Sequence, residues 1–193
     1  MPKSSKEALD WLLAGNERYA AEQQEYPNQS ITARLTLATR QNPFATILSC
    51  SDSRVPSEII FDQGLGDLFI VRTAGHVVNG LVLASIEFAV YALNVPLIVV
   101  LGHQHCGAVT AVLKDEPLPG YLPELVDYLR PAVQNATPGS HDAAEEAVRA
   151  NSRYTAAQLV SSSRVLADAV DEGRLQIVPA YYHLETGRVT VLD

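Results

Sequence analysis

The chain has 193 residues, of which 47% are hydrophobic, and a formal net charge of −8 with a pI near 5.1. This apolar content excludes an intrinsically disordered chain, and the length fits one domain over residues 1–193. The acidic balance excludes the basic surface that nucleic acid requires, so we expect no nucleic-acid partner. Two cysteines in a chain of this length make no disulfide framework, which favours a cytoplasmic location.

Residues 1–40 are predicted to form a helical arm ahead of the core. Ser4 and Glu7 have the spacing of a capping box, which predicts a helix over 4–24. A Tyr-Pro-Asn-Gln-Ser segment breaks this helix, and a short second helix is expected at 31–40.

Short apolar runs alternate with helical patterns through residues 44–193, the predicted core. Strands are predicted at 44–49, 68–71, 97–101, 175–181 and 188–192. Helices are predicted at 56–61, 80–93, 106–113 and 142–171, with one more inside the proline-rich segment 114–140. This alternation predicts an α/β fold with a mainly parallel central sheet flanked by helices.

One apolar stretch, 81–101, has the length of a membrane span. Glu87, Asn94 and Pro96 interrupt it, and the Asn-Val-Pro sequence is typical of a turn. We therefore expect a buried helix followed by a buried strand, and no membrane partner.

Both cysteines lie where a predicted strand ends, beside other metal-binding side chains. Cys50 follows one strand, and His103-x-x-Cys106 follows another. Thiolate and imidazole suit zinc, and three protein ligands with one exchangeable position are typical of a catalytic zinc site. Sites in open parallel sheets form at the carboxyl ends of the strands, so strands 44–49 and 97–101 should be neighbours. We expect His103 and Cys106 to share the first turn of a helix; the alternative is that both thiols are ordinary buried side chains.

Asp52-x-Arg54 follows Cys50 directly and allows two arrangements. Asp52 binds the metal itself as a fourth ligand, or Arg54 pairs with it through two hydrogen bonds and holds it away. In the second arrangement a water occupies the fourth position, and zinc lowers its pKa from about 15.7 towards ~7. Asp52 then accepts a hydrogen bond from the zinc-bound hydroxide. A plain surface ion pair that caps the turn is the remaining alternative.

These residues resemble the β-class carbonic anhydrases. The family pattern Cys-x-Asp-x-Arg … His-x-x-Cys-Gly is matched at Cys50, Asp52, Arg54, His103, Cys106 and Gly107. The similarity continues through 67–75 and 85–90, extends from about residue 5 to the end, and is strongest to actinobacterial members.

The resemblance implies a zinc enzyme for the reversible hydration of carbon dioxide to bicarbonate, with one Zn²⁺ per chain. It also implies a homodimer or homotetramer whose active sites lie at the dimer interface and whose N-terminal arm packs on the partner. Gln41 matches a glutamine that reaches substrate from the partner chain, and Phe69 matches a wall of the apolar substrate pocket. Further substrate contacts are implied at Ala74, Phe88 and Gly107.

The chain departs from the family pattern at two positions. Phe88 stands where many relatives have tyrosine, so the pocket keeps a ring without a hydroxyl. Ile47 stands where members with an allosteric bicarbonate site have tryptophan, so we expect that site to be absent in its usual form. His76 and His105 are either proton relays or polar packing residues.

Two other functions compete with this hypothesis. The same zinc chemistry acts on carbon disulfide or carbonyl sulfide in a few relatives, but these tend to lose the pocket sequence that Gln41 and Phe69 keep here. A catalytically silent zinc protein would hold Asp52 on the metal permanently, and Arg54 at this spacing is evidence against it.

Overall fold

The structure is a computed structural model that describes residues 2, 4–114, 116–134 and 142–193. Five strands of these described residues form one sheet in the order β2-β1-β3-β4-β5. The strands are β1 (Ala45–Cys50), β2 (Leu68–Thr73), β3 (Leu97–His103), β4 (Gln176–Tyr182) and β5 (Val189–Val191). The helices are α1 (Ser5–Ala20), α2 (Ile31–Leu37), α3 (Ser57–Ile60), α4 (Gly80–Leu93), α5 (Gly107–Lys114), α6 (Leu122–Gln134), α7 (Ala143–Ser162) and α8 (Arg164–Asp171), with a 3₁₀ turn η1 at Ala74–His76.

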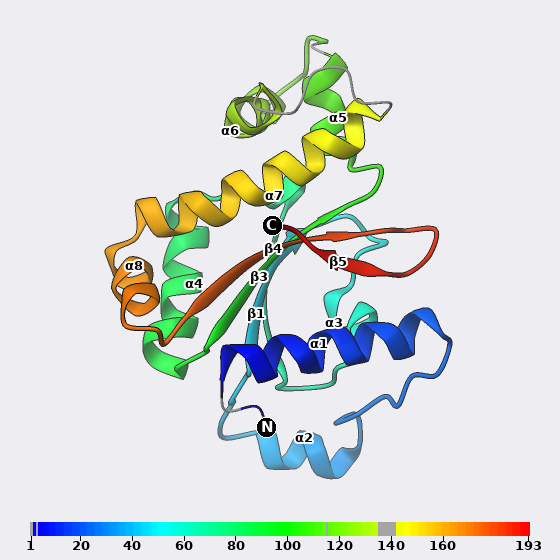
Figure 1. Cartoon of the computed structure of the whole chain (residues 1–193), viewed down its shortest axis with the longest axis vertical. Helices are drawn as coiled ribbons and strands as arrows, with labels where there is room; N and C mark the ends of the chain where they lie inside the picture. The colour runs from blue at the N-terminus through cyan, green and yellow to red at the C-terminus, as the bar shows by residue number, and fades with distance from the viewer. Residues whose placement is uncertain (1, 3, 115, 135–141) are drawn as a thin grey trace.

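The first four strands run parallel, and β5 returns antiparallel to β4. The predicted neighbours are confirmed, because β1 lies beside β3 with Ser49 opposite Leu101. The chain leaves β1 towards β2 on one side and later enters β3 on the other (Figure 1). Adjacent connections therefore diverge at the carboxyl ends of β1 and β3, which is where open α/β sheets form a crevice.

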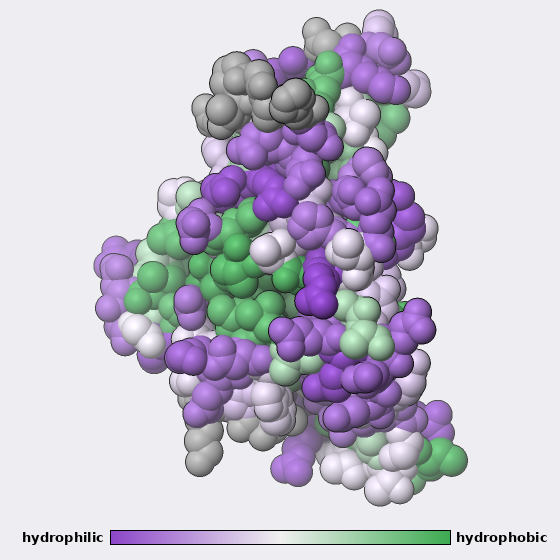
Figure 2. Space-filling model, turned by 45° about the vertical axis from the view of Figure 1, so that its right-hand side comes forward, coloured by the Kyte–Doolittle hydropathy of each residue, from purple (hydrophilic) through white to green (hydrophobic). Residues whose placement is uncertain are grey.

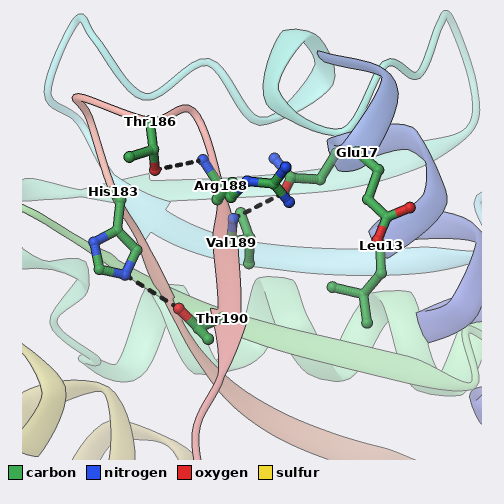
Figure 3. A pocket seen from close by; sticks show the side chains of 8 residues that line it. Leu13, Glu17, His183, Thr186, Arg188, Val189 and Thr190 are labelled. Atoms are coloured by element: carbon green, nitrogen blue, oxygen red, sulfur yellow. Dashed lines mark hydrogen bonds between the residues drawn. The ribbon is translucent and has the colours of Figure 1, made fainter. Parts of the chain in front are cut away.

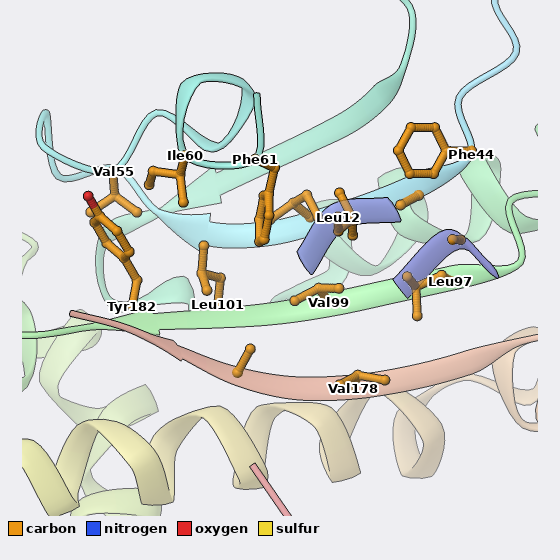
Figure 4. Close-up of a cluster of buried hydrophobic side chains, with 14 residues drawn as sticks. Leu12, Phe44, Val55, Ile60, Phe61, Leu97, Val99, Leu101, Val178 and Tyr182 are labelled. Atoms are coloured by element: carbon orange, nitrogen blue, oxygen red, sulfur yellow. The ribbon is translucent and has the colours of Figure 1, made fainter. Parts of the chain in front are cut away.

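Both faces of the sheet are covered, which explains the continuous apolar runs in β1 and β3. Successive side chains alternate between the faces: Ile47 and Val99 pack in the cluster with Leu12 of α1 (Figure 4). Leu48 and Val100 belong to the cluster on the opposite face, with residues of α4, α7 and α8. The mainly parallel, helix-flanked sheet predicted from the sequence is thus confirmed.

Helix α1 is anchored to its own chain through the buried Asn16. Its Nδ2 donates to the carbonyl oxygens of Ile60 (3.1 Å) and Gly187 (2.8 Å), and its Oδ1 accepts from the N–H of Val189 (2.7 Å). A groove of about 500 Å³ lies beside these contacts, between α1 and the β4–β5 hairpin (Figure 3). These contacts hold one face of α1 against its own chain.

Helix α2 is different, because it buries none of its residues within the described chain. Its Ile31 and Leu35 are each 69% exposed and lie one helical turn apart. If part of residues 1–40 packs on a partner, as the sequence predicts, α2 offers exposed apolar side chains for that contact, and Trp11 of α1 (50% exposed) offers another.

Two predicted helix boundaries are wrong. His103 is the last residue of β3, because β4 extends the pairing to Gly102 opposite Tyr181 and His103 opposite Tyr182. The predicted helix 142–171 breaks at Ser163, whose extended backbone (φ −129°, ψ 116°) separates α7 from α8.

Apolar residues gather on one face of the surface, bounded by polar residues (Figure 2). This area lies between the levels of α7 and α1, at the end of the sheet formed by β4 and β5, where Val191 is 40% exposed. A second exposed apolar row follows α4, with Leu81, Phe88 and Tyr91 exposed by 81%, 51% and 81%. Contiguous apolar surface of this kind is typical of protein contact sites. In the described part of the chain, no helix is both long enough and apolar enough to cross a membrane.

Candidate metal centre

Three side chains converge at the carboxyl edge of the sheet. Cys50 ends β1, His103 ends β3, and Cys106 lies just before α5. One ligand atom from each lies within 4.8 Å of the other two, and all three residues are buried. The three predicted ligands are thus brought together, although His103 and Cys106 do not share a helical turn. A tight turn through Gln104 and His105 (φ 55°) joins them instead.

The imidazole of His103 is oriented for metal binding. Its Nδ1 lies 2.9 Å from the carbonyl oxygen of Gln104, so Nδ1 carries the proton and donates it to that oxygen. Its Nε2 is fully buried and has no hydrogen-bond partner among the described residues. A buried nitrogen lone pair without a donor is costly, and a metal ion at this position would satisfy it.

The two thiols are coupled across 4.0 Å. The hydrogen bond from Cys106 lowers the pKa of Cys50, and contacts with His103 and the Gly75 N–H act in the same direction. The same hydrogen bond and burial raise the pKa of Cys106. Two adjacent thiolates repel each other, and a divalent cation bound between them removes that cost. Two sulfurs and one imidazole are a donor set that fits zinc.

Asp52 lies beside the three ligands and is held by Arg54. The Arg54 side chain donates from Nε to Oδ1 (2.9 Å) and from Nη2 to Oδ2 (2.7 Å), and the Arg54 N–H also donates to Oδ1 (2.9 Å). Asp52 Oδ2 is 4.0 Å from His103 Nε2. These hydrogen bonds from Arg54 hold the pKa of Asp52 well below its usual range. Of the two arrangements considered from the sequence, the structure contains the paired one.

Arg72 of β2 is a residue of this site that the sequence did not single out. Its Nε donates to the carbonyl oxygen of Cys50 (2.9 Å) and its Nη2 to that of Asp52 (2.6 Å). It therefore fixes the backbone that carries a metal ligand and the adjacent carboxylate. Its signals in the sequence are its position after the apolar run 68–71 and inside the segment 67–75 that resembles the family.

The predicted substrate residues divide into two groups. Ala74 and Gly107 lie at the site. Ala74 precedes Gly75, whose N–H contacts the sulfur of Cys50, and Gly107 follows Cys106. Phe69 is farther away. Thr73 is the residue of β2 that pairs with Cys50, and Phe69 precedes Thr73 by four positions, a distance of about 13 Å along the strand. Phe69 contacts Phe88 there, with ring centroids 6.3 Å apart.

Gln41 lies at the other end of β1 from Cys50. The strand begins at Ala45 and ends at Cys50, a span of about 17 Å, and the exposed Gln41 precedes it. Gln41, Phe69 and Phe88 are therefore not brought to the three ligands of their own chain.

Of the two histidines considered as proton relays, His76 is a packing residue. It is fully buried, and burial lowers its pKa to about 4, so it is neutral near pH 7. Its Nε2 lies 2.8 Å from Nδ2 of Asn151. His105 is exposed, and its carbonyl oxygen accepts a hydrogen bond from Arg54 Nη2 (3.3 Å).

Comparison with known proteins is consistent with this geometry. A family profile described as carbonic anhydrase matches residues 45–189. Carbonic anhydrase 2 of Mycobacterium tuberculosis is 46% identical over 186 residues, which cover 94% of this chain and 90% of that protein. The carbonic anhydrase of Mycolicibacterium smegmatis is 43% identical over 195 residues, with coverages of 98% and 94%. The solved structure of the β-carbonic anhydrase CcaA superimposes with a TM-score of 0.76 at 28% identity, covering 96% of this chain and 95% of that one.

Proposed function

This chain belongs to the β-class carbonic anhydrases, and on that premise we propose that it catalyses the reversible hydration of carbon dioxide at a zinc ion held by Cys50, His103 and Cys106. The observation that carries the proposal is the convergence of two sulfurs and the orphaned Nε2 of His103 at one buried point. When bound, zinc supplies the Lewis acidity that brings the pKa of water towards ~7 and so provides a nucleophile at neutral pH.

Asp52 and Arg54 form a hydrogen-bonded pair beside the three proposed ligands. Both carboxylate oxygens of Asp52 accept hydrogen bonds from Arg54, which keeps the carboxylate ionised and turned away from the position of a permanent fourth ligand. An ionised carboxylate held near the ligands accepts the hydrogen bond of a hydroxyl group and rejects an oxyanion. We infer that Asp52 orients the attacking oxygen in this way and that Arg54 positions Asp52.

The site is completed by a second copy of the chain. Gln41 and Phe69 lie towards the amino ends of β1 and β2, whereas the ligands lie at the carboxyl ends. Strand β2 is an edge strand, and the exposed apolar row of α4 lies near it, since Phe88 of α4 contacts Phe69 of β2. A two-fold related copy placed antiparallel along this edge brings the amino end of one β2 to the carboxyl end of the other.

The same surfaces support the expected homodimer or homotetramer. The apolar row on α4 provides one contact region, and α2 offers further exposed apolar side chains. The apolar area at the β4–β5 end of the sheet provides a second, which a tetramer requires. The two free, buried thiols fit a reducing compartment, as expected for a cytoplasmic protein.

The activity is tested by stopped-flow measurement of carbon dioxide hydration on zinc-loaded protein across the neutral pH range. We expect rapid turnover that disappears when a chelator removes the metal and returns when zinc is added. Protein that binds zinc stoichiometrically and shows no hydration would overturn the proposal.

The Asp52–Arg54 pair is tested by Arg54→Ala and Arg54→Lys. Both remove the two-pronged guanidinium contact, so kcat/KM should fall about 100-fold while zinc content stays unchanged. Arg164→Ala is the matched control, because Arg164 forms an exposed ion pair with Asp168 (3.6 Å) on α8. Unchanged turnover in both Arg54 variants would show that the pair is a surface contact without a role.

A further inference from the structure

A chain of hydrogen bonds connects helix α7 to the sulfur of Cys50. It starts at Asn151, which is 1% exposed in the middle of α7. Asn151 Nδ2 donates to the carbonyl oxygen of Gly75 (2.9 Å) and to Nε2 of His76 (2.8 Å). The N–H of Gly75 in turn donates to Sγ of Cys50 (3.3 Å).

The turn between these contacts has an unusual backbone. Gly75 (φ 64°) and His76 (φ 46°) are both left-handed, a conformation that costs a side-chain-bearing residue about 1–2 kcal/mol. Such a turn persists only where its surroundings hold it. Asn151 is placed to hold the turn, because its two N–H groups donate hydrogen bonds to the carbonyl oxygen of Gly75 and to the ring of His76.

The ring of His76 fits this arrangement only as an acceptor. The ring is fully buried, and an acceptor at Nε2 requires the neutral tautomer with its proton on Nδ1. Nδ1 has no hydrogen-bond partner among the described residues, and Ser152 Oγ of α7 also lies 3.5 Å from Nε2, so the polar contacts of the ring all come from α7. A donor on α7 therefore selects the tautomer and position of His76, which follows Gly75 directly. The result is an N–H group aimed at a sulfur that carries negative charge when it binds a cation.

We propose that Asn151 is a positioning residue for the metal centre: it fixes the Gly75–His76 turn so that the Gly75 N–H stabilises the Cys50 thiolate. The proposal rests on the zinc site proposed above. Hydrogen bonds to metal-binding groups orient them and tune their electron donation, and their loss typically lowers metal affinity by about 10–100-fold. Asn151 touches neither the metal nor the substrate, so its effect reaches them through Cys50.

The test compares Asn151→Ala and Asn151→Leu with the same changes at Asn16. Asn16 is the matched control, because it is 3% exposed and its Nδ2 also donates two hydrogen bonds, to the carbonyl oxygens of Ile60 and Gly187, outside the metal centre. Two quantities are measured: the zinc dissociation constant by chelator competition, and the sulfur-to-metal charge-transfer band of the Co²⁺-substituted protein. Asn151→Leu keeps the branched shape of the side chain and removes the donors without adding a charge, so it decides the question if the alanine variant fails to fold.

We expect both Asn151 variants to weaken zinc binding about tenfold or more and to move the charge-transfer band to lower energy, since a sulfur without its N–H donor gives up electrons more readily. The Asn16 variants should lower stability and leave both quantities unchanged. Asn151 variants that behave like the Asn16 variants would reduce Asn151 to a structural residue. Wild-type protein that binds no zinc would instead refute the proposed function itself, so the two failures are distinguishable.

Discussion

Asp62 shows how a single buried carboxylate stabilises this chain. It is 3% exposed and accepts hydrogen bonds from Arg18 Nε (2.6 Å), the Glu25 N–H (2.9 Å) and the Tyr26 N–H (3.0 Å). Burial alone raises the pKa of Asp62, but these donors together outweigh it and hold the pKa below its usual value. The ionised form therefore ties α1 and the loop after it to the core.

Replacing Asp62 by asparagine should destabilise the fold in a pH-dependent way. A folded-state pKa below the unfolded value of about 3.9 means that the stabilisation is present above that pH and is lost as pH falls through the folded pKa. Asp62→Asn should cost about 2 kcal/mol at pH 7, because the new amide faces donors, and the difference from wild type should shrink in acid. Urea unfolding at a series of pH values measures this. Asp10→Asn is the control, because Asp10 forms an exposed ion pair with Lys6 (2.7 Å). A difference in unfolding free energy between wild type and Asp62→Asn that does not change with pH would contradict this explanation.

At the residue scale, the sequence predicted the candidate metal-binding residues better than the residues that contact them. Cys50, His103 and Cys106 belong to residue types that few other roles bring together at strand ends, so spacing alone identified them. Asn151 gave no such signal, because an asparagine inside a helix is usually a surface residue. Its contact with Gly75 joins residues 76 positions apart and depends on two left-handed residues that no local pattern specified.

The break between α7 and α8 illustrates what a single side chain does to an element. Ser163 caps α8 by accepting a hydrogen bond from the Leu166 N–H (3.1 Å), and its hydroxyl donates to Glu87 Oε1 of α4 (2.6 Å). The helical pattern of 142–171 is continuous in sequence, so a single helix was predicted. A serine is compatible with either outcome, and the contact with Glu87 of α4 decides it.

Ser163→Ala should therefore destabilise the chain by about 2 kcal/mol, because it removes the helix cap and leaves the Glu87 carboxylate without this donor. Thermal and urea denaturation measure the change. Ser161→Ala is the matched control, since Ser161 is exposed near the end of α7 and bonds only to the nearby Gln158 carbonyl (3.3 Å) among the described contacts. Equal stability of the two variants would show that the Ser163 contacts contribute nothing.

At His103, too, the local sequence pattern failed to predict where an element ends, in this case a strand. The apolar run of the third strand stops at Leu101, and Gly102 is an ordinary signal for a turn. In the structure Gly102 stays in the strand, and a Cβ at this position would come within 2.4 Å of Ser152 Oγ. The glycine serves the close approach of α7 to the sheet, which a local pattern cannot distinguish from a turn.

At the scale of the whole molecule, a site shared between two chains predicts complementation. Gln41→Ala chains keep all metal ligands, and Asp52→Asn chains keep Gln41, so each homodimer should be impaired at both sites. Random reassembly of a mixture should restore one complete site in each mixed dimer, or about a quarter of wild-type activity. Hydration assays before and after dissociation and reassembly of the mixture measure this. Activity that never exceeds the sum of the two separate variants would place Gln41 outside the partner's site.

The assembly could be predicted only in part from the sequence. The resemblance places an arm in residues 1–40, and one face of α1 packs on the chain's own core through Leu12 and Asn16. Amphipathic helices that cover their own sheet and those that cover a neighbour have the same apolar spacing. The exposed Ile31 and Leu35 of α2 became recognisable as free surface only once the rest of the chain was in place.

The strand order also determines how late in folding the candidate metal site is completed. All three ligands lie within the first 106 residues, yet β3, which carries His103, pairs on its second side with β4, so that residue 97 lies opposite residue 176. Pairing over such a long stretch of chain is slow, because the intervening loop must close first. During synthesis the two cysteines therefore leave the ribosome well before the strand that makes their surroundings rigid. Cys50, His103 and Cys106 therefore reach their final surroundings only after residues 176–182 have been made.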